Sequence, residues 1–172
     1  MNNSYIFVII FLLSSISFFS IAPFVPTRKK DLKRISDLVA LKESENLLEI
    51  WCWTAKVCLF IAKHYPNNKI VWVELSPLFY VISKVKVFFS WIKNLEIIFW
   101  DAMKLDFSKY DVFYVFWLPE TITKLLFPKL DKEIKNNSRF FSYCFQMQND
   151  KFIEIKHKEK EKINSIYEYR KT

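Results

Sequence analysis

The sequence predicts an α/β domain whose largely parallel sheet is covered by helices on both faces, placed behind an uncharged amino-terminal segment. Two observations predict this fold class. Short apolar runs alternate with longer helix-like stretches from residue 46 to residue 135, which is the pattern of βαβ units. All 26 Lys and Arg and all 18 Asp and Glu follow residue 27, so the charged part of the chain is long enough for one domain with a real core.

Residues 5–22 form an uncharged and mostly apolar stretch. Eighteen helical residues span about 27 Å, close to the thickness of a bilayer core. We therefore expect one transmembrane helix here. A signal peptide is the alternative, but the first four residues lack the positive charge of such peptides, and residues 20–22 offer only a weak cleavage signal.

Basic residues gather directly after this segment. Five Lys or Arg residues lie between positions 28 and 34, against one acid, Asp31. This bias predicts a single-pass membrane protein whose following domain is cytoplasmic, and it also favours anionic lipid. The expected division is an anchor with its PFVPT element at 1–27 and a folded domain at 28–172. The net charge is +8, but the basic residues are interleaved with acidic ones over most of the chain. No nucleic-acid partner is therefore expected.

The expected elements follow in order along the domain. An amphipathic connector helix covers residues 28–41, with Thr27 as its N-cap. Strands are expected at 46–50, 69–74, 94–99 and 111–116, and helices at 54–65, 77–90 and 120–135. After the run SRFFSYCF, residues 151–157 and 163–170 flank the charged turn KEKEK, which predicts an antiparallel hairpin at the sheet edge.

The first strand-to-helix turn carries the main functional signal. In an open α/β sheet, the ligand lies beyond the carboxyl ends of the strands, and this turn approaches it closely. Residues 49–55 read EIWCWTA. With glycine in place of tryptophan they become EIGCGTA, which resembles the E/D-x-G-x-G-x-G loop of class I S-adenosylmethionine-dependent methyltransferases.

The resemblance continues downstream and implies a Rossmann-like class I methyltransferase sheet with S-adenosylmethionine as cofactor. Glu74 closes the second strand, where the family binds the ribose hydroxyls, and Asp101 follows the third strand, near the adenine amino group. A carboxylate is a sensible acceptor for two hydroxyls. The implied cofactor-binding residues are Glu49, Trp51, Trp53, Ala55, Glu74, Leu75, Asp101 and Ala102. Methyl transfer requires no metal, and none is expected.

A narrower resemblance rests on PFVPT at 23–27, WVELSP at 72–77 and WLPE at 117–120. These elements are similar to the membrane-anchored lysine methyltransferase family that includes the ATP synthase c-subunit methyltransferase. The resemblance implies a membrane partner and a protein substrate with an accessible lysine. Glu120 is the candidate contact for the acceptor amine, with Tyr114 and the PFVPT segment shaping the channel. As an alternative, Glu120 is an ordinary acid at a helix amino terminus.

Glycine is absent from the chain, where average usage predicts about 12. All six tryptophans fall where the resemblance expects glycine, at positions 51, 53, 72, 91, 100 and 117. Glycine there supplies positive φ and close backbone approach, and tryptophan supplies neither. One hypothesis accounts for both anomalies: the gene uses UGA as a glycine codon, and the sequence was translated as if UGA meant tryptophan.

Three other functions fit parts of the sequence. A methyltransferase acting on a lipid, quinone or other small molecule would use the same fold and anchor. A non-catalytic, membrane-tethered binding module would follow if indoles truly fill the cofactor loop. A nicotinamide-binding Rossmann domain is disfavoured, because the glycine-equivalent spacing is x-G-x-G-x-A and not G-x-G-x-x-G.

Overall fold

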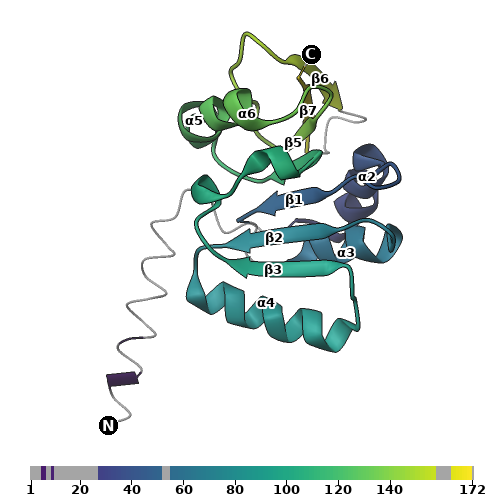
Figure 1. Ribbon diagram of the computed structural model, residues 1–172, viewed down its shortest axis with the longest axis vertical. Coiled ribbons are helices and arrows are strands. Elements are labelled where there is room, and N and C mark those ends of the chain that lie inside the picture. The colour runs from purple at the N-terminus through teal and green to yellow at the C-terminus, as the bar shows by residue number, and fades with distance from the viewer. Residues whose placement is uncertain (1–4, 7–8, 10–26, 52–54, 158–163, 172) are drawn as a thin grey trace.

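A computed structural model describes residues 5–6, 9, 27–51, 55–157 and 164–171. Within this part of the chain lies a seven-stranded sheet of order β3-β2-β1-β4-β5-β7-β6 (Figure 1). The strands are β1 (Leu47–Ile50), β2 (Ile70–Glu74), β3 (Leu95–Phe99), β4 (Val112–Val115), β5 (Arg139–Tyr143), β6 (Ile153–His157) and β7 (Ile166–Arg170). The first five strands are parallel to one another, and β7 runs antiparallel to both of its neighbours, β5 and β6. The predicted sheet and its carboxyl-terminal hairpin are confirmed.

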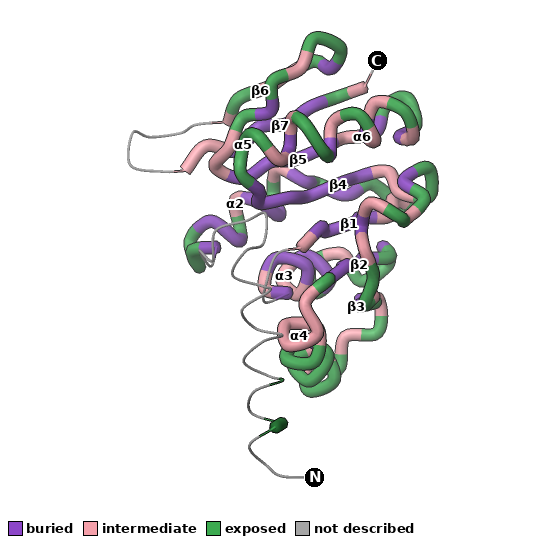
Figure 2. The backbone as a smooth tube through the Cα atoms, turned by 90° about the vertical axis from the view of Figure 1, so that its left-hand side faces the viewer, coloured by how far each residue is buried: buried purple, intermediate pink, exposed green. Residues whose placement is uncertain are grey.

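Two apolar clusters fill the space between the sheet and its helices, because strands buried on both faces send alternate side chains to opposite sides. On one face, Leu47, Trp72 and Tyr114 pack with residues of α2 (Lys29–Val39) and α3 (Lys56–His64). α4 (Pro77–Ser90) adds its inner side to this cluster. On the other face, Leu48 and Phe113 pack with the short helices described next. The central strands are buried along their length (Figure 2).

The helical region after β4 differs from the expected single helix at 120–135. It consists of α5 (Pro119–Thr121), a π-helical segment, η3 (Ile122–Leu126), and α6 (Phe127–Glu133). Pro128 gives the physical reason: its ring clashes with the carbonyl four residues earlier and it has no N–H to donate, so the helix widens just before it. Two 3₁₀ helices, η1 (Ala102–Lys104) and η2 (Phe107–Lys109), precede β4.

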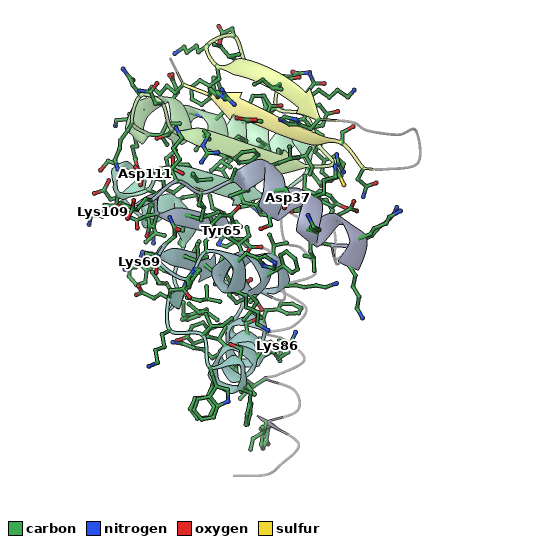
Figure 3. The ribbon with its side chains drawn as sticks, turned by 90° about the vertical axis from the view of Figure 1, so that its right-hand side faces the viewer. Asp37, Tyr65, Lys69, Lys86, Lys109 and Asp111 are labelled. Carbon is green, nitrogen blue, oxygen red and sulfur yellow. The ribbon has the colours of Figure 1, made fainter. Side chains whose placement is uncertain are left out.

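The connector helix is shorter than expected, and the predicted cap is wrong. α2 begins at Lys29 with Arg28 at the N-cap position, and no side chain caps it. Thr27 instead offers its carbonyl oxygen to Lys56 Nζ at 2.8 Å. At the other end of α2, Tyr65 donates its hydroxyl to the Ser36 carbonyl at 3.0 Å (Figure 3). These contacts fix α2 against α3.

Within the described ranges, no helix combines the length and the apolar character needed to cross a bilayer. Of the segment 5–22, on which the transmembrane prediction falls, only Tyr5, Ile6 and Ile9 lie among these residues. The PFVPT element is likewise outside them, apart from Thr27.

A buried polar cluster attaches α2 to the last two strands. The Tyr143 hydroxyl donates to Asp31 Oδ2 at 2.7 Å, and Arg34 lies 3.6 Å from the same carboxylate. Arg34 also donates to the carbonyls of His157 and Asn164, each at 2.7 Å. Since Asp31 is almost fully buried, its charge depends on such partners for stabilisation.

We expect Asp31→Ala to lower the free energy of unfolding by about 3 kcal/mol, because it leaves a buried guanidinium without its carboxylate. Chemical denaturation followed by circular dichroism measures the change. Asp37→Ala is the matched control on the same helix, because Asp37 forms an exposed pair with Lys33, and exposed pairs contribute little. Equal destabilisation by the two substitutions would contradict this role for Asp31.

Candidate functional site

The carboxyl ends of four parallel strands meet at one edge of the sheet. Register pairs Ile50 of β1 with Val73 of β2 on one side and with Val115 of β4 on the other. The chain runs outward from β1 through β2 to β3 and then returns to β4, so the topology switches between β1 and β4. In open α/β sheets, such a switch point is where ligands bind.

Trp51 is the first residue after β1 and has a left-handed backbone with φ 45°. Its N–H donates to the Val73 carbonyl at 3.0 Å, which holds this conformation in place. For a residue with a Cβ, the left-handed region costs roughly 1–2 kcal/mol, and glycine enters it without this cost. Ala55, at the start of α3, also has positive φ, 53°. Trp53 lies outside the described residues.

The switch point is filled by two indoles. The rings of Trp51 and Trp117 lie with centroids 4.8 Å apart and planes inclined by 35°. Neither indole Nε1, nor that of Trp72 in β2, has a hydrogen-bond partner in the part of the chain that the structure describes, although all three atoms are buried. A buried donor left unpaired costs about 1–3 kcal/mol. With both side chains present, the indoles occupy the crevice in which ligands of such sheets bind.

Glu49 supports the loop from below. It is fully buried, and its Oε2 accepts a hydrogen bond from the Cys58 N–H at 2.7 Å. Cys58 lies in the first turn of α3, so the carboxylate satisfies a free helix N–H and interacts favourably with the helix dipole. The structure thus gives Glu49 a positioning role at the helix, while the resemblance implied cofactor contact.

Glu74 ends β2 with a buried carboxyl group. The residue is 5% exposed, and Oε1 accepts a hydrogen bond from the Ser76 N–H at 2.7 Å. Burial raises the pKa of Glu74 to about 7, and the backbone hydrogen bonds from Ser76 and Leu75 oppose this shift. A carboxyl group at a strand end whose pKa is raised by burial is typical of a functional site. Ribose hydroxyls are donors that would stabilise its charged form.

This pKa predicts a definite pH dependence of stability. Because the folded pKa is about 7 and the usual value is 4.5, the native state holds the Glu74 proton more tightly than the unfolded state. Stability is therefore expected to fall by up to about 3 kcal/mol as pH rises from 4.5 through 7. Denaturant unfolding of wild type and Glu74→Gln at pH 5 and pH 8 measures this, and only wild type should show the additional loss. Equal losses would contradict it.

The end of β3 lies beside Glu74. Asp101 Oδ1 accepts from the Met103 N–H at 2.9 Å and so caps η1, while Ala102 is fully buried. Leu75 is exposed. Sequence reasoning missed Phe99, which ends β3 and has a large exposed side chain. The centroid of its ring lies 5.3 Å from that of Tyr80. The signal for Phe99 is an aromatic residue at the end of the strand, two positions before the candidate adenine-binding acid.

The two candidate catalytic residues lie in different environments. Glu120 is exposed in the first turn of α5, and its Oε1 pairs with Lys124 Nζ at 2.5 Å, which lowers the pKa of Glu120. Tyr114 is fully buried in the middle of β4, within the cluster that faces α2 and α3. A side chain in that position does not line a channel open to solvent, so this geometry disfavours substrate contact by Tyr114.

Comparisons with known proteins agree with this architecture. No protein-family model matches the sequence. The chain is 23% identical over 132 residues to a protein from Saccharolobus islandicus described as a protein-lysine N-methyltransferase, covering 73% of this chain and 78% of that protein.

Two solved structures show the likeness of fold. An RNA methyltransferase from Salinibacter ruber in complex with S-adenosyl-L-homocysteine has a TM-score of 0.72 and 19% identity, over 85% of this chain and 93% of that one. A precorrin-6y C5,15-methyltransferase from Geobacter metallireducens has a TM-score of 0.64 and 14% identity, over 90% and 94%. The chain therefore has the Rossmann-like fold of the class I S-adenosylmethionine-dependent methyltransferases.

Proposed function

We propose that this chain is an S-adenosylmethionine-dependent methyltransferase that acts on a lysine of a protein at a membrane. One observation supports the choice of cofactor: the buried carboxyl group of Glu74 lies at the carboxyl end of β2, beside the switch point of a methyltransferase-like sheet. The lysine acceptor is supported by the Saccharolobus relative. The membrane location is supported by the apolar stretch at 5–22 and the basic residues at 28–34.

We further propose that positions 51, 53, 72, 91, 100 and 117 are glycine in the protein made by the cell, because UGA is decoded as glycine. Several observations support this. Trp51 and Trp91 have positive φ, 45° and 58°. Trp91 follows α4 at the position where helices commonly end in a left-handed glycine. The buried indole nitrogens at 51, 72 and 117 have no hydrogen-bond partner among the described residues, and this absence and the filled crevice also favour glycine.

The chemistry asks little of the protein beyond alignment. S-adenosylmethionine supplies a methyl group on a sulfonium, and the protein must orient the acceptor amine and exclude water. A lysine has a reference pKa near 10.4, so the acceptor must lose a proton before it reacts. Glu120 is the first acidic residue after β4 in the sequence. Its exposed salt bridge with Lys124 is weak enough to be replaced by one with a substrate amine.

Mass spectrometry of membranes from wild-type and deletion strains tests the function. We expect a lysine in a membrane protein to lose one or more methyl groups in the deletion strain. Restoring the gene should restore methylation, and restoring it with Glu74→Ala should not. If every membrane-protein lysine is unchanged while a lipid or quinone loses a methyl group, the small-molecule alternative replaces the lysine proposal.

The membrane side of the proposal has its own test. In sealed inside-out vesicles, a cytoplasmic domain is exposed, so added protease should digest residues 28–172. Protection of the domain would contradict the cytoplasmic location.

The nucleotide sequence tests the glycine proposal directly: UGA at the six codons supports the proposal, and UGG codons overturn it.

A further inference from the structure

α4 is apolar on the side that faces away from the sheet. Its inner side, with Tyr80, Ser83 and Val87, packs toward the sheet and α3. On the outer side, Val81, Val85 and Phe88 recur at helical spacing, and Phe89 lies beside them. Phe88 and Phe89 are 73% and 71% exposed. A helix that is apolar all round is normally buried on both sides.

α4 lies at one end of the molecule, next to the edge strand β3 (Figures 1 and 2). Among the described elements, α4 packs mainly on β3 and β2, and its outer side chains are exposed. Exposed apolar surface of this kind, rimmed by polar residues, marks an interaction site. We define the α4 outer face as Val81, Val85, Phe88 and Phe89.

Charge indicates the partner. By helical spacing, Lys84 and Lys86 lie on the two sides of the outer face, and both are exposed. Figure 3 labels Lys86. Lys93 follows the helix, and together with Lys63 it lines a hollow at the carboxyl-terminal end of α4. From Leu75 to Leu95 the sequence contains no Asp or Glu. An apolar stripe with lysines on both sides and no acid matches an anionic bilayer surface, with the lysine stems extending toward the headgroups.

We propose that the α4 outer face docks on the surface of an anionic lipid bilayer. Phe88, Phe89 and the two valines enter the boundary between headgroups and acyl chains, and Lys84 and Lys86 contact lipid phosphates. α4 begins three residues after Glu74, so docking brings the carboxyl edge of the sheet close to the membrane surface. This inference goes beyond the proposed function, because α4 binds lipid whether or not the chain transfers methyl groups.

Photo-cross-linking of the full chain tests the occupant. p-Benzoylphenylalanine replaces Phe88, and the protein is mixed with vesicles of phosphatidylcholine containing phosphatidylglycerol. After irradiation, we expect mass spectrometry to find the label joined to lipid. The matched control carries the label at Ile153, which is also exposed and apolar but lies on β6, at the opposite edge of the sheet. It should give little lipid adduct.

The charge requirement is tested with Lys84→Gln/Lys86→Gln in the labelled chain. Each lysine near an anionic surface contributes about fivefold to partitioning, so removing both should lower the lipid adduct by up to about 25-fold. Vesicles of phosphatidylcholine alone should give a similar loss. A second label site at Phe89, with circular dichroism of each variant, guards against a local folding defect.

Other cross-linked products would overturn the proposal. A label joined to residues 5–22 of the same chain would mean that this segment covers α4. A label joined to a second chain would mean an interface between copies. Equal lipid adducts from Phe88 and Ile153, or no effect of the lysine substitutions, would contradict docking. None of these readouts depends on methyl transfer, so a failure here is distinct from a failure of the proposed function.

Discussion

The chain with glycine at positions 51, 53, 72, 91, 100 and 117 is expected to bind S-adenosylmethionine, and the chain with tryptophan there is not. The indole rings of Trp51 and Trp117 contact each other at the switch point. Their removal therefore opens the crevice beside Glu74. Glycine also removes the cost of a left-handed tryptophan, roughly 1–2 kcal/mol at Trp51 and again at Trp91. Isothermal titration calorimetry of both chains measures the difference.

Stability provides an independent readout of the same substitutions. If Trp72 and Trp117 were native core residues, replacing either with a small residue would cost about 3–5 kcal/mol, and the six-glycine chain would unfold. We expect instead a folded chain that is at least as stable as the tryptophan form. Trp91→Gly alone is the control, because this exposed residue is far from the crevice: it should stabilise the chain without restoring binding. An unfolded six-glycine chain would overturn the glycine proposal.

In the glycine-bearing chain, Glu74→Ala should weaken S-adenosylmethionine binding by about 10- to 150-fold. The carboxylate is the proposed acceptor for the ribose hydroxyls, and a hydrogen bond to a charged group contributes about 1.5–3 kcal/mol.

Glu96→Ala is the matched control for this measurement. Glu96 is an exposed carboxylate on the neighbouring strand β3, paired with Lys69 at 2.9 Å. Its removal should leave the affinity unchanged. Unaltered binding in Glu74→Ala would exclude this residue from the cofactor site.

Sequence patterns predicted most of the fold because its signals are local. α4 begins and ends at the expected residues, since Pro77 suits the first turn of a helix and the apolar spacing continues to Ser90. The helix after β4 departs from the pattern, because the apolar spacing is helical on both sides of Pro128 while the proline itself interrupts the helix. The cap at Thr27 failed because its carbonyl, and not its hydroxyl, makes the contact with Lys56.

The site was harder to predict than the fold, because the role of a residue depends on the direction in which its side chain points. Strand β4 is buried on both faces, so its apolar pattern did not tell on which side Tyr114 would lie. Glu49 stood in the right loop, yet its carboxylate turns back to α3. Order along the chain placed Glu74 and Asp101 at strand ends, and the parallel register brought those ends together.

The attachment of α2 to the last strands has a consequence for biosynthesis. Asp31 and Arg34 find their partners at Tyr143, His157 and Asn164, more than a hundred residues later. β7 inserts between β5 and β6, so β5 gains its second neighbour only when residue 170 has left the ribosome. Contacts of such long sequence separation form slowly. The buried charges of Asp31 and Arg34 therefore lack these partners until late in translation, although the apolar side of α2 can already pack on α3 and the central strands.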